Sequence, residues 1–395
     1  MDYSVSAYII PSICLYLLLV RILRTRNLRQ LQKQYGHYTH DPYSMDYKTA
    51  HKIVLQIAVR EFPFTYGFGM QCGIIKSYGI PSTSKLLVQT RRLTSKAKVG
   101  KRIEDTSVFL GEMLVSGIDS SRGLLVLSKL NWIHRQYGAR ISNDELLYTL
   151  GLFILEPIRW IDTREWRQLS TIERVAIFIY WKEIGNRMGI HGIPGTLDEL
   201  KRWNTAFEAG NMGFSETNRM CAAATVDASM RPRPRFMKGF GKRAMAWCMQ
   251  DYVRPVLGME EPSRGFSLGM MAFFQLRAFA TRHLMLPRLF DPKRSRIDSS
   301  ATKRIRRTRY FVEPWYVPET MWSATRKILF VKSTNLPGPE YMSGGYLPEE
   351  LGPVEYMERS RDAVFKEAEA MKEYVSDGGA AGVGCPFSFS GQNPL

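Results

Sequence analysis

Helix-starting signals recur along this chain and constrain its fold more than any other feature. Three segments begin with a capping box, in which Ser or Thr is followed three residues later by Glu: Ser142 with Glu145, Ser170 with Glu173, and Thr196 with Glu199. Apolar residues recur at spacings of three and four, as they do on one face of a helix. No alternating run of five or more residues predicts a strand. The sequence therefore predicts an all-α fold.

Helical patterns cover most of the chain up to residue 284 and return near its end. Prolines and basic residues interrupt them from residue 287 to residue 353, and residues 376–395 have the Gly-rich and Ser-rich composition of a disordered tail. The predicted helices span residues 45–60, 64–77, 82–94, 97–116, 121–137, 143–155, 171–190, 196–208, 215–226, 240–252, 266–284 and 355–375.

The N-terminus carries no charge from Tyr3 to Val20, a length that is sufficient to cross a hydrocarbon core of about 30 Å. A cleaved signal peptide is the alternative, but Asp2 replaces the expected basic start and no small-residue cleavage site follows. We therefore expect one transmembrane helix within residues 1–23. The basic residues behind it place the rest of the chain in the cytosol by the positive-inside rule: Arg21, Arg24, Arg26, Arg29 and Lys33.

The net charge of +18 raises the question of a polyanionic partner. Basic clusters at 231–238 and 293–309 lack the fold signature of a nucleic-acid module. Next to a membrane anchor, such charge suits anionic lipid headgroups, although a solvated loop has the same composition. We expect a membrane partner and no nucleic acid. The five cysteines have no disulfide or zinc spacing, which favours a reducing compartment.

Two short patterns suggest chemistry but stand in the wrong context. The G-x-S-x-G pattern around Ser267 is that of serine hydrolases, yet no strand precedes it as a nucleophile elbow requires. His37 and His40, followed by Asp41, have metal-like spacing but lie in a polar neck where such groups are usually solvated. The chain also has no HExxH, P-loop or dinucleotide fingerprint.

One histidine occupies a position where a helix would place a leucine. In the predicted helix 121–137, His134 shares one face with Leu127, Leu130 and Tyr137. Burying an imidazole there costs free energy unless a partner satisfies it. The residues alone leave two interpretations open, a core histidine bonded to a carbonyl or a ligand of a metal or haem.

A second polar set lies within the predicted helix 97–116. Arg102 and Thr106 are four residues apart and so share a face, and Asp105 lies beside them. A surface pair explains this spacing as well as a pocket does, so the pattern alone decides nothing.

Ordered motifs across the chain resemble the fungal MpaB family of ER-bound oxygenases, which shares its catalytic domain with the bacterial rubber oxygenases, the latex-clearing proteins. The segments that carry the resemblance are YGIPSTSKLLVQT (78–90), KRIEDT (101–106), NWIH (131–134), ISNDELLYTLGLFILEPIRWI (141–161), EWR (165–167) and YWKEIG (180–185). The resemblance covers about residues 45–290, which are thus expected to form the catalytic domain. A basic neck (24–44) would precede it, and a basic, proline-rich extension with a late helix (291–375) would follow.

The resemblance implies a globin-like helical domain with haem b, O2 as co-substrate and a location at the endoplasmic reticulum membrane. His134 matches the proximal haem ligand, with a carbonyl or carboxylate orienting its other nitrogen, and Leu127, Leu130 and Tyr137 would line the ring. Arg102 and Thr106 match the haem-pocket helix: Arg102 would stabilise a propionate or developing charge, and Thr106 would donate to oxygen. Asp105 would relay protons or hold Arg102.

The implied reaction is oxidation of a lipophilic secondary-metabolite intermediate, with cleavage of a carbon–carbon double bond. Rubber oxygenases carry a glutamate upstream of the Arg–Thr helix as a candidate base, and the stretch STSKLLVQT has none. No second histidine stands in a matching motif either. A membrane-anchored haem-binding or scaffold protein without catalysis is the alternative that these departures leave open.

Overall fold

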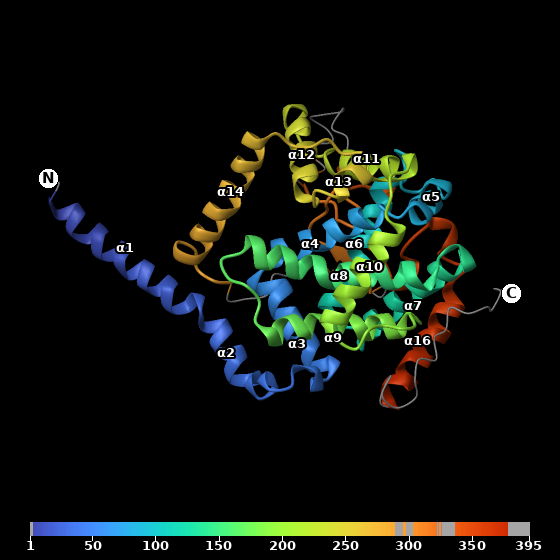
Figure 1. Ribbon diagram of the computed structural model, residues 1–395, viewed down its shortest axis with the longest axis horizontal. Coiled ribbons are helices and arrows are strands. Elements are labelled where there is room, and N and C mark those ends of the chain that lie inside the picture. The colour runs from blue at the N-terminus through green and yellow to red at the C-terminus, as the bar shows by residue number, and fades with distance from the viewer. Residues whose placement is uncertain are drawn as a thin grey trace. The chain divides into compact units, whose positions relative to one another are not determined.

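The computed structural model describes residues 3–288, 295–297, 303–321, 323, 325 and 336–377. The chain folds into two compact units. Figure 1 shows its helices, with the colour running from blue at the N-terminus to red at the C-terminus. The first comprises residues 1–73, 152–181 and 262–291, and the second comprises residues 74–151, 182–261 and 292–395. Most of the predicted tail, from residue 378 onward, lies outside the described residues.

Helices dominate both units, so the predicted all-α class is confirmed, while a globin-like arrangement stays a prediction. The first unit contains α1 (Tyr3–Arg24), α2 (Arg26–Tyr35), η1 (Gly36–Thr39), η2 (Pro42–Ser44), α3 (Tyr47–Leu55), the π-helical η3 (Gln56–Glu61) and α14 (Arg264–His283). Three helices have residues in both units: α4 (Pro63–Ser77), α8 (Asn143–Arg164) and α9 (Thr171–Arg187).

The second unit holds the remaining helices and one small sheet. Its helices are α5 (Pro81–Gln89), α6 (Val99–Val115), α7 (Ser121–Arg135), η4 (Gly138–Arg140), α10 (Leu197–Asn211), α11 (Glu216–Ser229), α12 (Arg235–Cys248), α13 (Val253–Val256), η5 (Pro339–Tyr341), η6 (Pro348–Glu350), η7 (Val354–Tyr356) and α16 (Arg361–Ser376). The strands β1 (Ser295–Ile297) and β2 (Ile305–Arg307) pair antiparallel.

The predicted capping boxes start helices as expected. At α10, the Thr196 hydroxyl accepts from the Glu199 amide, and the Glu199 carboxylate accepts from the Thr196 amide. The same reciprocal bonds join Ser142 to Glu145 and Ser170 to Glu173. Each box satisfies backbone donors that a helix leaves unpaired at its N-terminus.

Several predicted helix boundaries are wrong, for local reasons. Helix α8 was expected to stop at residue 155, before Pro157, but it continues to Arg164. Gly69 faces the Pro157 backbone so closely that a Cβ there would lie 2.7 Å from the Pro157 Cα, and this close packing supports the helix at the proline. Helix α5 ends earlier than predicted, at Gln89, and Arg91 just beyond it adopts a left-handed φ of 53°.

The N-terminal segment forms the predicted apolar helix, α1. Among the described residues, the helical stretch that begins at Tyr8 is the one that is long and apolar enough to cross a membrane. The neck that follows is also helical: α2 buries Leu31 and Tyr35 and exposes Arg26, Arg29 and Lys33.

Neither weak motif forms a site. Ser267 lies in the first turns of α14, and its amide donates to the Ser263 carbonyl, so no strand leads into it. His37 lies in η1, and within the described residues no group of His, Cys, Asp or Glu has the arrangement of a metal site.

Candidate functional site

Helix α7 carries His134 within the second unit. The Ser120 hydroxyl caps its N-terminus by accepting from the Gly123 amide, and its flanks pack against α6 and α16. The His134 ring is half-buried, and its Nδ1 atom is buried with no hydrogen-bond partner among the described residues. The carbonyl or carboxylate expected to orient this ring is therefore not found there. A buried polar atom without a partner needs an explanation, and a ligand is one.

The surroundings keep this imidazole neutral. Burial, together with the nearby cations Arg102 and Arg135, lowers the pKa of His134 to about 4. A neutral imidazole has a nitrogen lone pair free to bind a metal ion, which an imidazolium lacks. At neutral pH, His134 is thus in the protonation state that metal ligation requires.

The two sides of α7 differ in a way that the apolar spacing did not predict. Leu127 is fully buried, but Leu130 and Tyr137 are only half-buried, as His134 is. The polar residues Lys129 and Asn131 of the same helix are instead fully buried. The face around His134 is consequently the less completely covered one.

The C-terminal extension covers the polar side of α7. The Lys129 ammonium donates to the Tyr356 carbonyl at 3.0 Å and to the Ser360 hydroxyl at 2.5 Å. Asn131 donates to Glu367 at 2.9 Å, and Arg135 pairs with the same carboxylate. The C-terminal extension therefore positions the helix that carries His134.

Arg102 and Thr106 lie on α6 and contact each other as their spacing predicts. The Arg102 guanidinium donates to the Thr106 hydroxyl, which itself donates to the Arg102 carbonyl at 2.8 Å. The Thr106 hydroxyl therefore donates within its own helix, and its expected donation to oxygen stays a prediction. Arg102 is half-buried and pairs with no carboxylate among the described residues, so its charge is open to an anionic group.

Asp105 does not join this pair. Its carboxylate accepts from the Lys101 ammonium at 2.7 Å and from the Tyr316 hydroxyl at 2.6 Å, and it is buried. Lys101 also donates to the Gly352 carbonyl at 2.6 Å. The expectation that Asp105 holds Arg102 is therefore not met, since Asp105 ties α6 to the C-terminal extension.

Two further carboxylates on α6 extend this connection, and the sequence analysis missed both. Glu104 is fully buried. Its carboxylate accepts hydrogen bonds from the backbone amides of residues 311–313, with the Val312 nitrogen 2.6 Å from Oε1, and it forms an ion pair with Arg307. Glu112 accepts from the Tyr346 hydroxyl at 2.5 Å and pairs with Arg122. The available signal was the set of charged residues, Glu104 and Glu112 among them, within an otherwise largely apolar helix.

Tyr78 is a second residue that the sequence analysis did not single out. Its ring is buried, its hydroxyl accepts from Thr225 at 3.4 Å, and burial raises its pKa to about 12. The charge of Arg102 acts on both Tyr78 and His134, so these three groups share one electrostatic neighbourhood. The site thus combines a neutral imidazole, a neutral phenol and a guanidinium with no carboxylate partner among the described residues.

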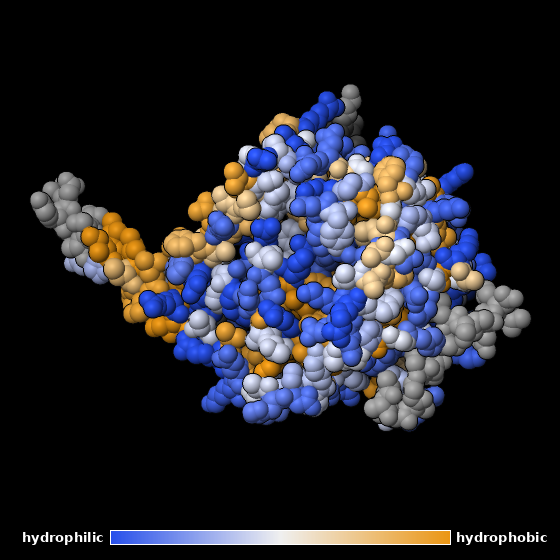
Figure 2. Space-filling view, viewed as in Figure 1, coloured by the Kyte–Doolittle hydropathy of each residue, from blue (hydrophilic) through white to orange (hydrophobic). Residues whose placement is uncertain are grey.

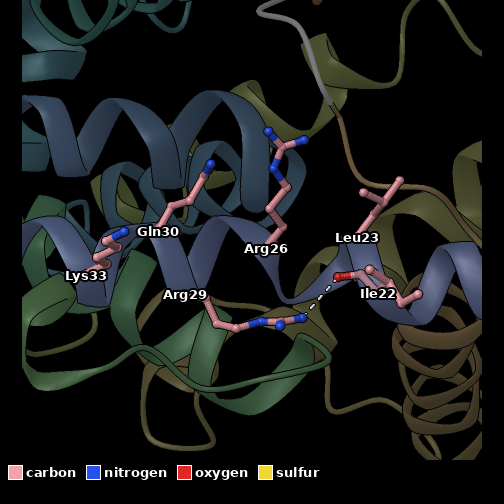
Figure 3. A pocket seen from close by; sticks show the side chains of 6 residues that line it. All are labelled: Ile22, Leu23, Arg26, Arg29, Gln30 and Lys33. Atoms are coloured by element: carbon pink, nitrogen blue, oxygen red, sulfur yellow. Dashed lines mark hydrogen bonds between the residues drawn. The ribbon is translucent and has the colours of Figure 1, made fainter.

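A hollow elsewhere in the chain is unrelated to this site. It lies along the end of α1 and the start of α2, and Figure 3 shows Arg29 bonded across it to the Ile22 carbonyl at 3.1 Å. Its lining residues are Ile22, Leu23, Arg26, Arg29, Gln30 and Lys33. Aliphatic and basic side chains next to an apolar helix suit a membrane surface better than catalysis.

Comparison with known proteins gives related chains along nearly the whole length. ER-bound oxygenase mpaB' of Penicillium brevicompactum is 28% identical over 396 residues, covering 94% of this chain and 92% of that one. ER-bound oxygenase mpaB of Penicillium roqueforti (strain FM164) is 31% identical over 257 residues, covering 61% of this chain and 86% of that one.

A third relative, ER-bound oxygenase mpaB of Penicillium brevicompactum, is 27% identical over 342 residues, covering 85% of this chain and 82% of that one. No protein-family model matches the sequence. All three relatives are named as ER-bound oxygenases. The chain therefore belongs to the mpaB family of ER-bound oxygenases, and is an oxidoreductase of that type.

Proposed function

We propose that this chain is a haem-dependent oxygenase anchored in the endoplasmic reticulum membrane. Its substrate would be a lipophilic intermediate of secondary metabolism, and the reaction an oxidative cleavage of a carbon–carbon double bond. The observation that carries the proposal is the buried, unpartnered Nδ1 of His134 in a ring that stays neutral.

The residues around His134 fit a haem in three respects. A neutral imidazole is the commonest protein ligand to haem iron. Half-buried Leu130 on α7 and half-buried Tyr137, two residues beyond the end of α7, offer apolar contact to a flat ring. Arg102, without a carboxylate partner among the described residues, can neutralise a propionate. Haem b, held by His134, is thus the cofactor that this site would bind.

Haem would supply the activation of O2, which in its ground state reacts poorly with closed-shell alkenes. The protein's own groups have simpler tasks. Arg102 presents a permanently charged donor toward the neighbourhood of His134, and Thr106 fixes its direction through the hydrogen bond between them. Tyr78 stays protonated and can act as a neutral donor.

The N-terminal elements and the names of the relatives support the proposed location. Helix α1 would span the membrane, and the exposed cations of α2 would remain on the cytosolic side. The relatives are named as ER-bound, which suggests the same membrane here. A lipophilic substrate concentrates in a bilayer, so an anchored catalytic domain would meet it there.

Haem content tests the proposal without knowledge of the substrate. Full-length protein purified from membranes in detergent, with haem supplied during expression, is expected to contain stoichiometric haem b by pyridine haemochrome assay. A protein that stays free of haem after expression and after reconstitution with haemin would contradict the proposal.

A further inference from the structure

Helix α14 exposes an apolar stripe where a surface helix normally carries charge. Leu268, Ala272, Leu276 and Phe279 recur at spacings of four, four and three and are all exposed. Leu276 is 68% exposed and Phe279 is 58% exposed, so no described part of the protein covers them. A contiguous apolar face of this kind marks an interaction surface.

The opposite side of α14 carries the polar contacts. Arg277 donates to the Glu165 carboxylate at 2.9 Å, and its guanidinium lies 5.1 Å from the centre of the Phe64 ring. Phe274 is buried beside Trp160, with ring centres 5.8 Å apart. A helix that turns an ion pair toward the protein and apolar side chains outward has the pattern of a lipid-exposed element.

The end of α14 is joined to the apolar helix α1 of the same unit. The Tyr16 hydroxyl donates to the Leu284 carbonyl at 2.9 Å, and Arg24 donates to the Met285 carbonyl. Figure 1 shows α1 (blue) beside the C-terminal end of α14 (orange). In Figure 2 apolar residues run along α1 and over the neighbouring α14. The exposed side chains of Leu284 and Met285 continue the stripe toward α1.

We propose that α14 is a second membrane element, whose apolar stripe lies in the interfacial region of the bilayer that α1 spans. Continuity with α1 identifies lipid as the occupant, because a surface joined to a membrane-spanning helix lies at membrane depth. The exposed cations Arg282, at the end of α14, and Arg288, just beyond it, match anionic headgroups. The proposal rests on anchoring by α1 but not on haem.

Depth-dependent quenching in vesicles tests this with the full chain. A Leu276→Cys variant is labelled with an environment-sensitive fluorophore and reconstituted into phosphatidylcholine vesicles containing phosphatidylserine. Cys14→Ser and Cys385→Ser are added so that the label goes to residue 276, since Cys72, Cys221 and Cys248 are buried. Lys52→Cys, an exposed position on α3 of the same unit, is the matched control. A label on native Cys14, exposed on α1, reports the anchor.

The expected result is that acyl-chain spin-labelled lipids quench the labels at residues 276 and 14 several-fold more than the label at residue 52. If iodide quenches the label at residue 276 as strongly as the label at residue 52, the stripe of α14 lies in water. That result overturns the proposal for α14 and leaves the anchor intact. Shielding of residue 276 from both quenchers indicates a second copy of the chain and also overturns it. A Cys14 label that stays in water contradicts the anchor, and the proposal falls with it.

Discussion

A buried imidazole nitrogen without a hydrogen bond costs a protein about 1–3 kcal/mol, so His134 needs a compensating partner. The unpartnered Nδ1 and the half-covered face around it favour the ligand that we propose over a satisfied core histidine. The spacing of apolar residues identified this position, but not the missing partner, because hydrogen-bond satisfaction depends on residues distant in sequence. Asp105 illustrates the same limit, since its partner Tyr316 lies on another segment.

Arg102 is expected to act on the reaction and not on cofactor retention. Arg102→Ala should keep haem but lose about a hundredfold in oxygen-dependent turnover, because a preorganised donor in an active site is worth about 3 kcal/mol. Thr106→Ala should lose less, and Thr106→Ser should restore the rate, since Thr106 positions Arg102 through its hydroxyl. Arg202→Ala, at an exposed position on α10, is the control. Full turnover in haem-replete Arg102→Ala would refute this role.

Lys129 should make stability depend on pH. Burial lowers its pKa from 10.5 to about 8 in the folded chain. Between these values the unfolded state holds a proton that the folded state has released, so the free energy of unfolding rises with pH by up to about 1.4 kcal/mol per unit. Urea unfolding at pH 7 and pH 10 measures this effect. Wild type should gain stability between the two pH values through Lys129, and Lys129→Met should not. The free energy of unfolding of Lys129→Met minus that of wild type should therefore be smaller at pH 10 than at pH 7.

The control for this measurement is Lys372→Met, which replaces an exposed lysine of α16. Its stability relative to wild type should be the same at both pH values. If the difference between Lys129→Met and wild type is also constant across this range, Lys129 is not held in the buried state that its contacts describe.

At the scale of elements, α6 and α7 each serve two purposes on different faces. Helix α6 carries Arg102, whose charge lowers the pKa of His134, while Lys101, Glu104 and Asp105 bind the C-terminal extension. The apolar periodicity predicted that these helices exist and about where they begin. The buried ion pairs could not be predicted because the interrupted sequence after residue 287 gives no periodic signal for its own position.

Glu104 should be the group on which attachment of the extension depends most. In Glu104→Gln the side chain keeps its shape but loses the charge that satisfies Arg307 and several backbone amides. Breaking a buried pair of this kind typically costs about 3–5 kcal/mol, so the urea midpoint should fall markedly. Glu358→Gln, an exposed change in the same extension, should leave the midpoint unchanged. A Glu104→Gln protein as stable as wild type would show that the extension is held by other contacts.

At the scale of the whole molecule, the apolar N-terminus and the basic residues behind it carry the topology that we propose, with the bulk of the chain in the cytosol. If that topology is right, protease treatment of intact microsomes should digest a C-terminal epitope. Protection of that epitope until detergent is added would mean that the topology is inverted. The uncharged N-terminal stretch predicted α1, but the lipid-facing stripe of α14 could be recognised only once its neighbours were known.

The central claim is that His134 holds haem iron, and the absorption spectrum of matched histidine variants tests it most directly. Full-length wild type and His191→Ala, which removes an exposed imidazole, are expected to show the same Soret band. His134→Ala should lose or shift that band while its far-ultraviolet circular dichroism stays that of the wild-type helical fold. A His134→Ala protein with the wild-type Soret band and haem content would contradict the account.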